Sequence, residues 1–137
     1  MPEQPDPFSG AWRFNTQLSK LSTPSPRSWI QEILANFDEI HVRENIVRAD
    51  GSETVVSVRA KFDGKDHPVE GSPAADMIAY TRVDQNTISG TGKKNGIVSL
   101  TETVTVASEN GTLTLSYSLH AGPKVVANGI AVFEKHS

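Results

Sequence analysis

The chain has 137 residues, a formal net charge of −3 and no cysteine. One domain is therefore expected, and disulfides, thiolate metal sites and thiol nucleophiles are excluded. The mildly acidic balance gives no reason to expect a nucleic acid or an anionic membrane as a partner. No apolar run approaches the ~20 residues of a membrane helix, and residues 1–7 lack the basic start and apolar stretch of a secretion signal. We expect a soluble cytoplasmic protein, although a mature exported form with an added Met1 would have the same features.

The first elements of the chain are a proline-rich arm and a strand. Three prolines precede Phe8 and predict an extended arm over residues 1–9. Residues 10–15 follow as a strand, and prolines make residues 21–27 an irregular connector. Residues 29–37 allow two interpretations, because their apolar side chains recur at helical spacing and also alternate as in a strand. We follow the strand interpretation on the resemblance described below.

The rest of the chain, residues 39–134, consists of predicted strands joined by turns. Alternation of apolar and polar side chains is cleanest in residues 54–62 and 112–119. Tight turns that need positive φ are indicated at Asp50-Gly51, Asp63-Gly64, Asn95-Gly96 and Asn110-Gly111. Nine or ten strands in this rhythm predict an all-β fold, a single antiparallel up-and-down β-barrel over residues 10–137. Closure into a barrel hides both sheet edges, and a sandwich is the competing architecture.

Several short segments follow one another along the chain: Gly10-x-Trp12, Asn15, Ser19-Lys20, residues 60–69, residues 71–76, residues 82–84 and residues 132–135. In this order they resemble segments of small bacterial lipocalin-like proteins. These proteins belong to the calycin superfamily, with distant similarity to lipocalins and fatty-acid-binding proteins. The resemblance covers most of the chain and implies a barrel whose closed end is plugged by Trp12. It implies little about function, because such proteins mostly have none assigned.

Two departures separate the chain from fatty-acid-binding proteins. Those proteins carry Arg-x-Tyr on the last strand to bind a carboxylate, whereas the matching stretch here is Ala131-Val132-Phe133. A bidentate guanidinium contact is a main source of that specificity. The two helices that cover their barrel mouth do not fit the short connector before Ser28. The carboxylate-binding function is therefore not carried over.

Glu102 is the most informative polar residue, because it lies in the most apolar row of its strand, Val98, Leu100, Glu102, Val104 and Val106. If that row faces inward, the carboxylate needs a partner such as Arg43, Arg59 or Arg82. Tyr80, Tyr117 or His120 would complete a polar pocket suited to binding or proton transfer. In the alternative, which we favour at this point, Glu102 faces solvent and the Thr101, Thr103 and Thr105 row lies inside or on a second packed surface.

No motif indicates catalysis, a metal or a cofactor. The acidic cluster at residues 63–70 fits turn chemistry, and residues 90–94 lack the spacing of a phosphate loop. We expect noncatalytic binding of a small, partly apolar ligand inside the barrel. The alternatives are a small barrel enzyme, an isomerase or hydrolase with a Glu/His/Arg pocket, and a packed structural or interaction domain. The oligomeric state is open. Candidate cavity residues are Trp12, Arg43, Arg59, Tyr80, Arg82, Glu102 and Tyr117.

Overall fold

The computed structural model describes residues 6–107 and 111–136, which form ten antiparallel strands and no helix. The strands are β1 Gly10–Leu21, β2 Ser28–Ala35, β3 Glu39–Val47, β4 Glu53–Lys61, β5 His67–Glu70, β6 Met77–Asp84, β7 Thr87–Lys94, β8 Ile97–Ala107, β9 Thr112–Ala121 and β10 Lys124–Lys135. None of these described segments is therefore a helix that could span a bilayer.

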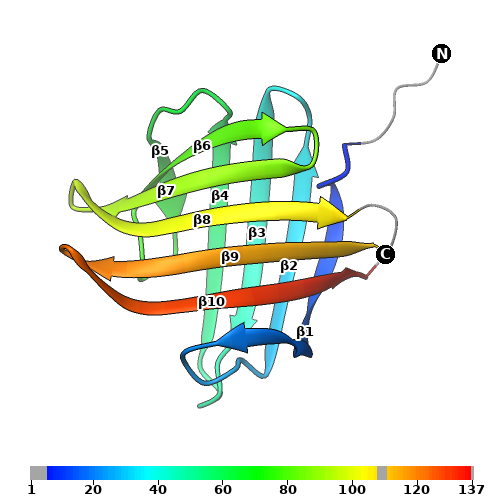
Figure 1. Cartoon of the computed structure of the whole chain (residues 1–137), viewed down its shortest axis with the longest axis vertical. Coiled ribbons are helices and arrows are strands. Elements are labelled where there is room, and N and C mark those ends of the chain that lie inside the picture. The colour runs from blue at the N-terminus through cyan, green and yellow to red at the C-terminus, as the bar shows by residue number, and fades with distance from the viewer. Residues whose placement is uncertain (1–5, 108–110, 137) are drawn as a thin grey trace.

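The strands follow one another around a closed barrel, and β1 pairs with both β2 and β10 to complete it. In Figure 1, β7–β10 cross in front of β2–β4 at a steep angle, so two crossing sheets enclose the interior. The register of β1 against β10 shifts between Asn15 and Lys20, which lets β1 bend from one sheet to the other. The predicted antiparallel barrel of nine or ten strands is confirmed, with ten strands.

Strand alternation explains which side chains fill the interior. In β4, Val56, Val58 and Ala60 are buried while their neighbours Ser57 and Arg59 are exposed. In β2, the same alternation buries Gln31 and Ile33 and exposes Glu32 and Leu34. The strand interpretation of residues 29–37 is therefore confirmed as far as Ala35, where β2 ends, and the helical spacing of the apolar residues there is coincidental.

An aromatic plug closes one end of the barrel. Phe8 and Trp12 are fully buried, and the Trp12 indole Nε1 donates a hydrogen bond of 3.0 Å to the carbonyl oxygen of Phe8. Phe133 is also fully buried and packs edge-on against Phe14 at a centroid distance of 5.9 Å. Residues 6–9 of the predicted arm thus lie on the barrel, while residues 1–5 fall outside the described part of the chain.

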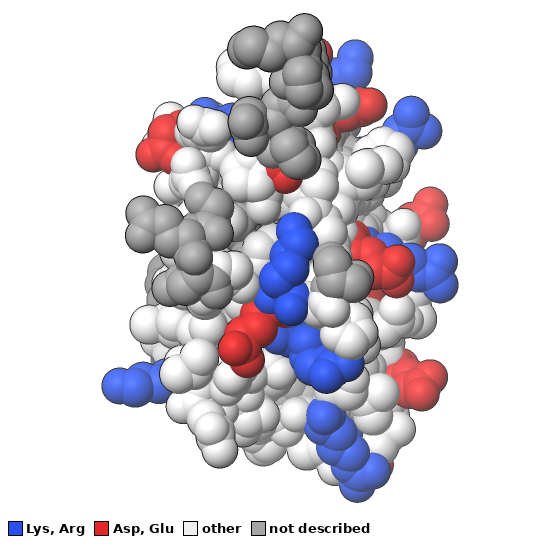
Figure 2. All heavy atoms as spheres, turned by 90° about the vertical axis from the view of Figure 1, so that its right-hand side faces the viewer, with Lys and Arg blue, Asp and Glu red and all other residues white. Residues whose placement is uncertain are grey.

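Arg82 fastens the N-terminal segment to this closed end. Its Nη1 lies 2.8 Å from the Asp6 carboxylate and donates to the Asn36 carbonyl oxygen at 3.1 Å. Its guanidinium carbon also lies 5.4 Å from the Phe8 ring centroid and 5.3 Å from that of Phe62. Figure 2 shows both basic and acidic side chains on the surface of the right-hand side of Figure 1.

Two glycines with the same backbone conformation differ in how closely neighbouring backbone approaches them. Gly71 and Gly96 have similar left-handed backbones, with φ of 83° and 80°. A Cβ at position 71 would overlap the carbonyl oxygen of Val55, whereas a Cβ at position 96 would meet nothing within 4 Å. Gly96→Ala should cost about 1–2 kcal/mol for the backbone conformation alone. Gly71→Ala should cost at least about 2 kcal/mol more, because backbone must move. Urea unfolding measures both, and equal losses would contradict the predicted close approach.

Candidate ligand cavity

The half of the barrel away from the plug contains a cavity of about 330 Å3. Phe8 forms part of its lining on the side of the plug. Its walls are mostly apolar, which suits a small molecule with an apolar body. The apolar lining includes Trp29, Ile33, Ile40, Val42, Ile46, Val56, Ile88, Leu100, Val104, Leu115 and Leu119.

Paired residues on β6, β7, β8 and β9 form a row along the cavity wall, called the polar row below. Gly90 pairs with Tyr80 on one side and with Glu102 on the other, and Glu102 pairs in turn with Tyr117. A Cβ at position 90 would lie 3.0 Å from Cε1 of Tyr80 and 3.1 Å from Cγ of Glu102. The glycine therefore lets these two side chains close over its backbone. Tyr80, Glu102 and Tyr117 all line the cavity.

A second set of polar side chains lines the cavity from β2 and β3. Gln31 on β2 pairs with Glu44 on β3, and both line the cavity. The Trp29 indole Nε1 donates a hydrogen bond of 2.9 Å to Oε1 of Glu44. This bond satisfies the only indole donor in the cavity wall and holds the Glu44 carboxyl against that wall.

Burial raises the pKa of both cavity carboxyls, Glu44 and Glu102. Burial and the Glu44 carboxyl raise the pKa of Glu102 from 4.5 to about 8. Burial also raises the pKa of Glu44, and the hydrogen bond from Trp29 partly offsets this rise. Burial and both carboxyls raise the pKa of Tyr80 well above 10. Among the described residues, the ion pairs join Asp63 to His67, Asp6 to Arg82 and Asp66 to Lys93, and none includes a cavity carboxyl.

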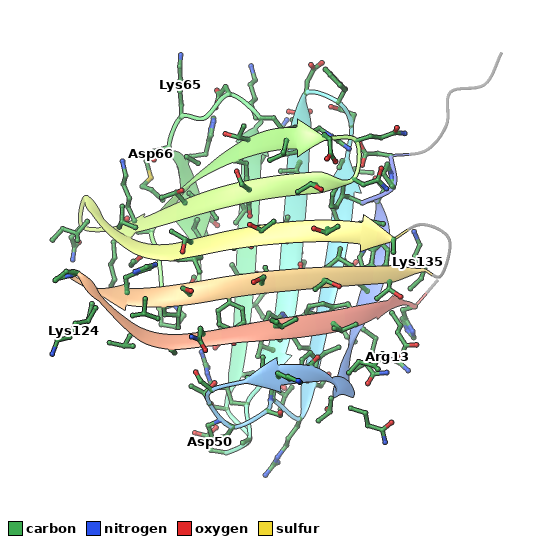
Figure 3. All side chains as sticks on the ribbon, in the orientation of Figure 1. Arg13, Asp50, Lys65, Asp66, Lys124 and Lys135 are labelled. Atoms are coloured by element: carbon green, nitrogen blue, oxygen red, sulfur yellow. The ribbon has the colours of Figure 1, made fainter. Side chains whose placement is uncertain are left out.

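The cavity opens between the β1–β2 connector and the β3–β4 hairpin. An outer hollow of about 420 Å3 adjoins it there, lined by Pro24 and Pro26 of the connector and by Asp50 of the hairpin. Asp50 marks this hairpin at the lower edge of the molecule (Figure 3). Arg48 lines both the cavity and the outer hollow, and its guanidinium hydrogen-bonds Oγ1 of Thr54. The guanidinium is therefore held at the rim of the cavity.

Three of the seven predicted cavity residues, Tyr80, Glu102 and Tyr117, line the cavity. The solvent-facing orientation favoured for Glu102 is wrong, because its apolar row faces inward and Thr103 and Thr105 are exposed. His120 does not join the pocket, since its Nε2 lies 3.0 Å from the Thr101 hydroxyl and neither residue lines the cavity.

The other four predicted residues lie elsewhere. Arg43 and Arg59 are exposed on the outer surface, since strand alternation turns Val42 and Val58 inward instead. Arg82 lies at the closed end of the barrel, where its guanidinium forms an ion pair with the Asp6 carboxylate. Trp12 lies within the plug and does not line the cavity. These placements correct the prediction that Glu102 has an arginine partner.

The sequence prediction missed Trp29, Gln31, Glu44 and Arg48. A signal for Glu44 was present, because Ile40, Val42, Glu44 and Ile46 occupy alternate positions of one strand. The same reasoning that singled out Glu102 would have placed Glu44 inside the barrel. Gln31 and Trp29 share a face only in the strand interpretation of residues 28–35. No local signal marked Arg48, which follows the last residue of β3.

Comparisons with known proteins identify the fold. No family model matches the chain, and no curated protein sequence matches it. The crystal structure of zebrafish ileal bile acid-binding protein in complex with cholic acid matches with a TM-score of 0.61 and 13% sequence identity. The match covers 94% of this chain and 98% of that one. The chain therefore shares its overall barrel fold with that protein.

The raised pKa of Glu102 predicts a pH-dependent stability. Between pH 4.5 and about 8 the folded chain retains a proton that the unfolded chain has released, so the free energy of unfolding falls as pH rises through this window. Glu102→Gln removes the penalty. The free energy of unfolding of Glu102→Gln minus that of the wild type should be at least about 1 kcal/mol larger at pH 8.5 than at pH 5.

Urea unfolding at the two pH values measures this difference. Glu32→Gln is the matched control, because it removes an exposed carboxyl from the same barrel and should behave alike at both pH values. A pH-independent effect of Glu102→Gln would show that the Glu102 carboxyl is not desolvated.

Proposed function

We propose that this protein binds a small, partly apolar molecule inside its barrel without transforming it. One observation carries the proposal. The cavity is lined by polar side chains that have no protein partner, although the barrel buries them deeply. Gln31 is 7% exposed and Tyr80 is 6% exposed, and neither side chain makes a hydrogen bond within the described chain. Buried polar groups are normally paired, so a bound molecule is the natural partner for these.

The cavity also distinguishes binding from a purely structural role. A packed barrel would fill its interior with side chains at crystal-like density. Here about 330 Å3 is left open behind a mouth, within the size range of small-molecule sites. We propose Gln31, Tyr80, Glu102 and Tyr117 as the polar contacts of the ligand.

The solved structure with the same fold gives support at the level of architecture. That structure is of a bile acid-binding protein in complex with cholic acid. A barrel of this kind can therefore hold an apolar molecule that carries polar groups. At 13% identity the likeness concerns the fold alone, and the ligand class has to come from the cavity side chains of this chain.

The enzyme alternative lacks much of its predicted pocket. Of the Glu/His/Arg combination, the glutamates line the cavity together with Arg48 at the rim. The four histidines, His41, His67, His120 and His136, do not line it. Within the described residues, no group of three or more His, Asp or Glu side chains is placed to hold a metal ion. Binding is therefore the better-supported proposal.

Binding can be tested with Prodan, a small neutral dye whose emission reports an apolar environment. About one dye per chain should bind with micromolar affinity. That affinity corresponds to ~8 kcal/mol, within reach of burying ~300 Å2 of apolar surface at ~25 cal/mol per Å2. Val56→Trp should abolish binding, because Val56 lines the cavity and is buried.

Val55→Trp is the matched control on the adjacent, outward-facing position of β4. It should bind the dye as the wild type does. Circular dichroism checks that both variants fold, since overpacking at Val56 costs ~1–3 kcal/mol. Absence of saturable binding by the wild type, or loss of binding in both variants, would overturn the cavity as the binding site.

A further inference from the structure

We propose that the ligand of this cavity carries a protonated amine, held between the carboxyls of Glu44 and Glu102, on an apolar body. The inference rests on the proposed binding function and adds the class of ligand. It starts from the polar groups that face the cavity interior from opposite walls, Glu44 on β3 and Glu102 on β8.

The titratable groups that line the cavity are few, and each can be placed. They are Glu44, Arg48, Tyr80, Glu102 and Tyr117. Arg48 is held at the rim by Thr54 and also faces the outer hollow. The interior beyond the rim therefore contains two acids and two phenols and no basic side chain among the described residues. Such a site favours a cation and disfavours an anion.

The neutral polar side chains that have no hydrogen-bond partner in the protein, Gln31 and Tyr80, also favour an ammonium head group. An ammonium has three N–H donors and no acceptor. The carbonyl oxygen of Gln31 and the phenol oxygen of Tyr80 both accept hydrogen bonds, and both side chains are more than nine-tenths buried without a protein partner. The Trp29 donor, which could have served an anion, is already used by Glu44. Acceptors are thus available in the interior, and its indole donor is committed to Glu44.

Aromatic side chains surround the two carboxyls. Trp29 is hydrogen-bonded to Glu44, Tyr80 is packed beside Glu102 over Gly90, and Tyr117 pairs with Glu102 on the next strand. Aromatic faces attract cations, most strongly where water is excluded. An ammonium bound here would meet carboxylates and ring faces together, while its alkyl or aryl body would contact the apolar walls.

Binding of a cation should release a proton from the cavity. In the unliganded protein burial and Glu44 hold the pKa of Glu102 at about 8, so at neutral pH its carboxyl is protonated. A neighbouring ammonium favours the ionised form and lowers that pKa. Amine affinity should therefore rise as pH increases from 6 to 8, by up to about tenfold per unit. It should fall again only when the amine itself loses its proton, above about pH 10.

The test compares three ligands with the same eight-carbon tail: octylamine, 1-octanol and octanoate. Each displaces Prodan from the wild-type protein at pH 8. Octylamine should bind at least about tenfold more tightly than octanol, a difference of about 1.4 kcal/mol, and octanoate should bind most weakly. Only octylamine should gain affinity between pH 6 and pH 8.

Two variants and a control assign the effect to the carboxyls. Glu102→Gln and Glu44→Gln should each reduce octylamine affinity about tenfold or more and leave octanol affinity within about twofold. Glu102→Gln should also flatten the pH dependence. Glu32→Gln removes the same charge from the outer surface of β2, and it should change none of these values.

The outcomes separate this inference from the binding function. Equal affinities for the three ligands, with Prodan still bound, would overturn the amine preference and leave the cavity as a binding site. Tighter binding of octanoate than of octylamine would indicate that Arg48 at the rim binds the head group, and it would overturn the role of Glu44 and Glu102. Failure of Prodan and all three ligands to bind would overturn the proposed function itself.

Discussion

The strict alternation of side chains in a closed barrel is the constraint on which the rest of this structure depends. Once ten strands close, every second side chain must face the interior, whatever its chemistry. Glu44 lies between Val42 and Ile46, and Glu102 lies between Leu100 and Val104, in rows that the apolar residues commit to the inside. The two carboxyls face inward because their neighbours do, burial raises the pKa of both, and Glu102, with a pKa of about 8, retains its proton at neutral pH.

The interior of the barrel has two parts, a packed plug at one end and an open cavity at the other. At one end Phe8 and Trp12 are fully buried. Arg82 there contacts the Asp6 carboxylate, backbone carbonyl oxygens and two aromatic ring faces. The Arg82 charge is paired with the Asp6 carboxylate there, although its buried Nε has no hydrogen-bond partner among the described residues. At the other end the polar groups face an open cavity. The pairing of opposite charges distinguishes the two ends, because Arg82 and Asp6 form an ion pair at the plug and no ion pair of the described residues includes a cavity carboxyl.

Much of the fold could be predicted because its signals are local. Alternation and Asp-Gly or Asn-Gly turns indicated the barrel, and only residues 29–37 needed a family resemblance to choose strand over helix. The site was less predictable for a chemical reason. We assumed that an inward Glu102 requires an arginine, although alternation already turned Arg59 outward. A proton neutralises the carboxyl instead, and no sequence pattern reveals that. The Arg82 contacts join positions 6, 36 and 82, which only the folded chain brings together.

Two glycines, one in the polar row and one beside it on β10, make room for the large side chains next to them. From β6 to β10 the paired positions are Tyr80, Gly90, Glu102, Tyr117 and Gly129. A Cβ at Gly129 would lie 2.8 Å from the Tyr117 hydroxyl, and Gly90 is equally crowded by its neighbours. Each glycine therefore receives an adjacent large side chain that would otherwise project into the open volume. Tyr80, Glu102 and Tyr117 lie against the wall, and their polar ends border a space that they do not fill.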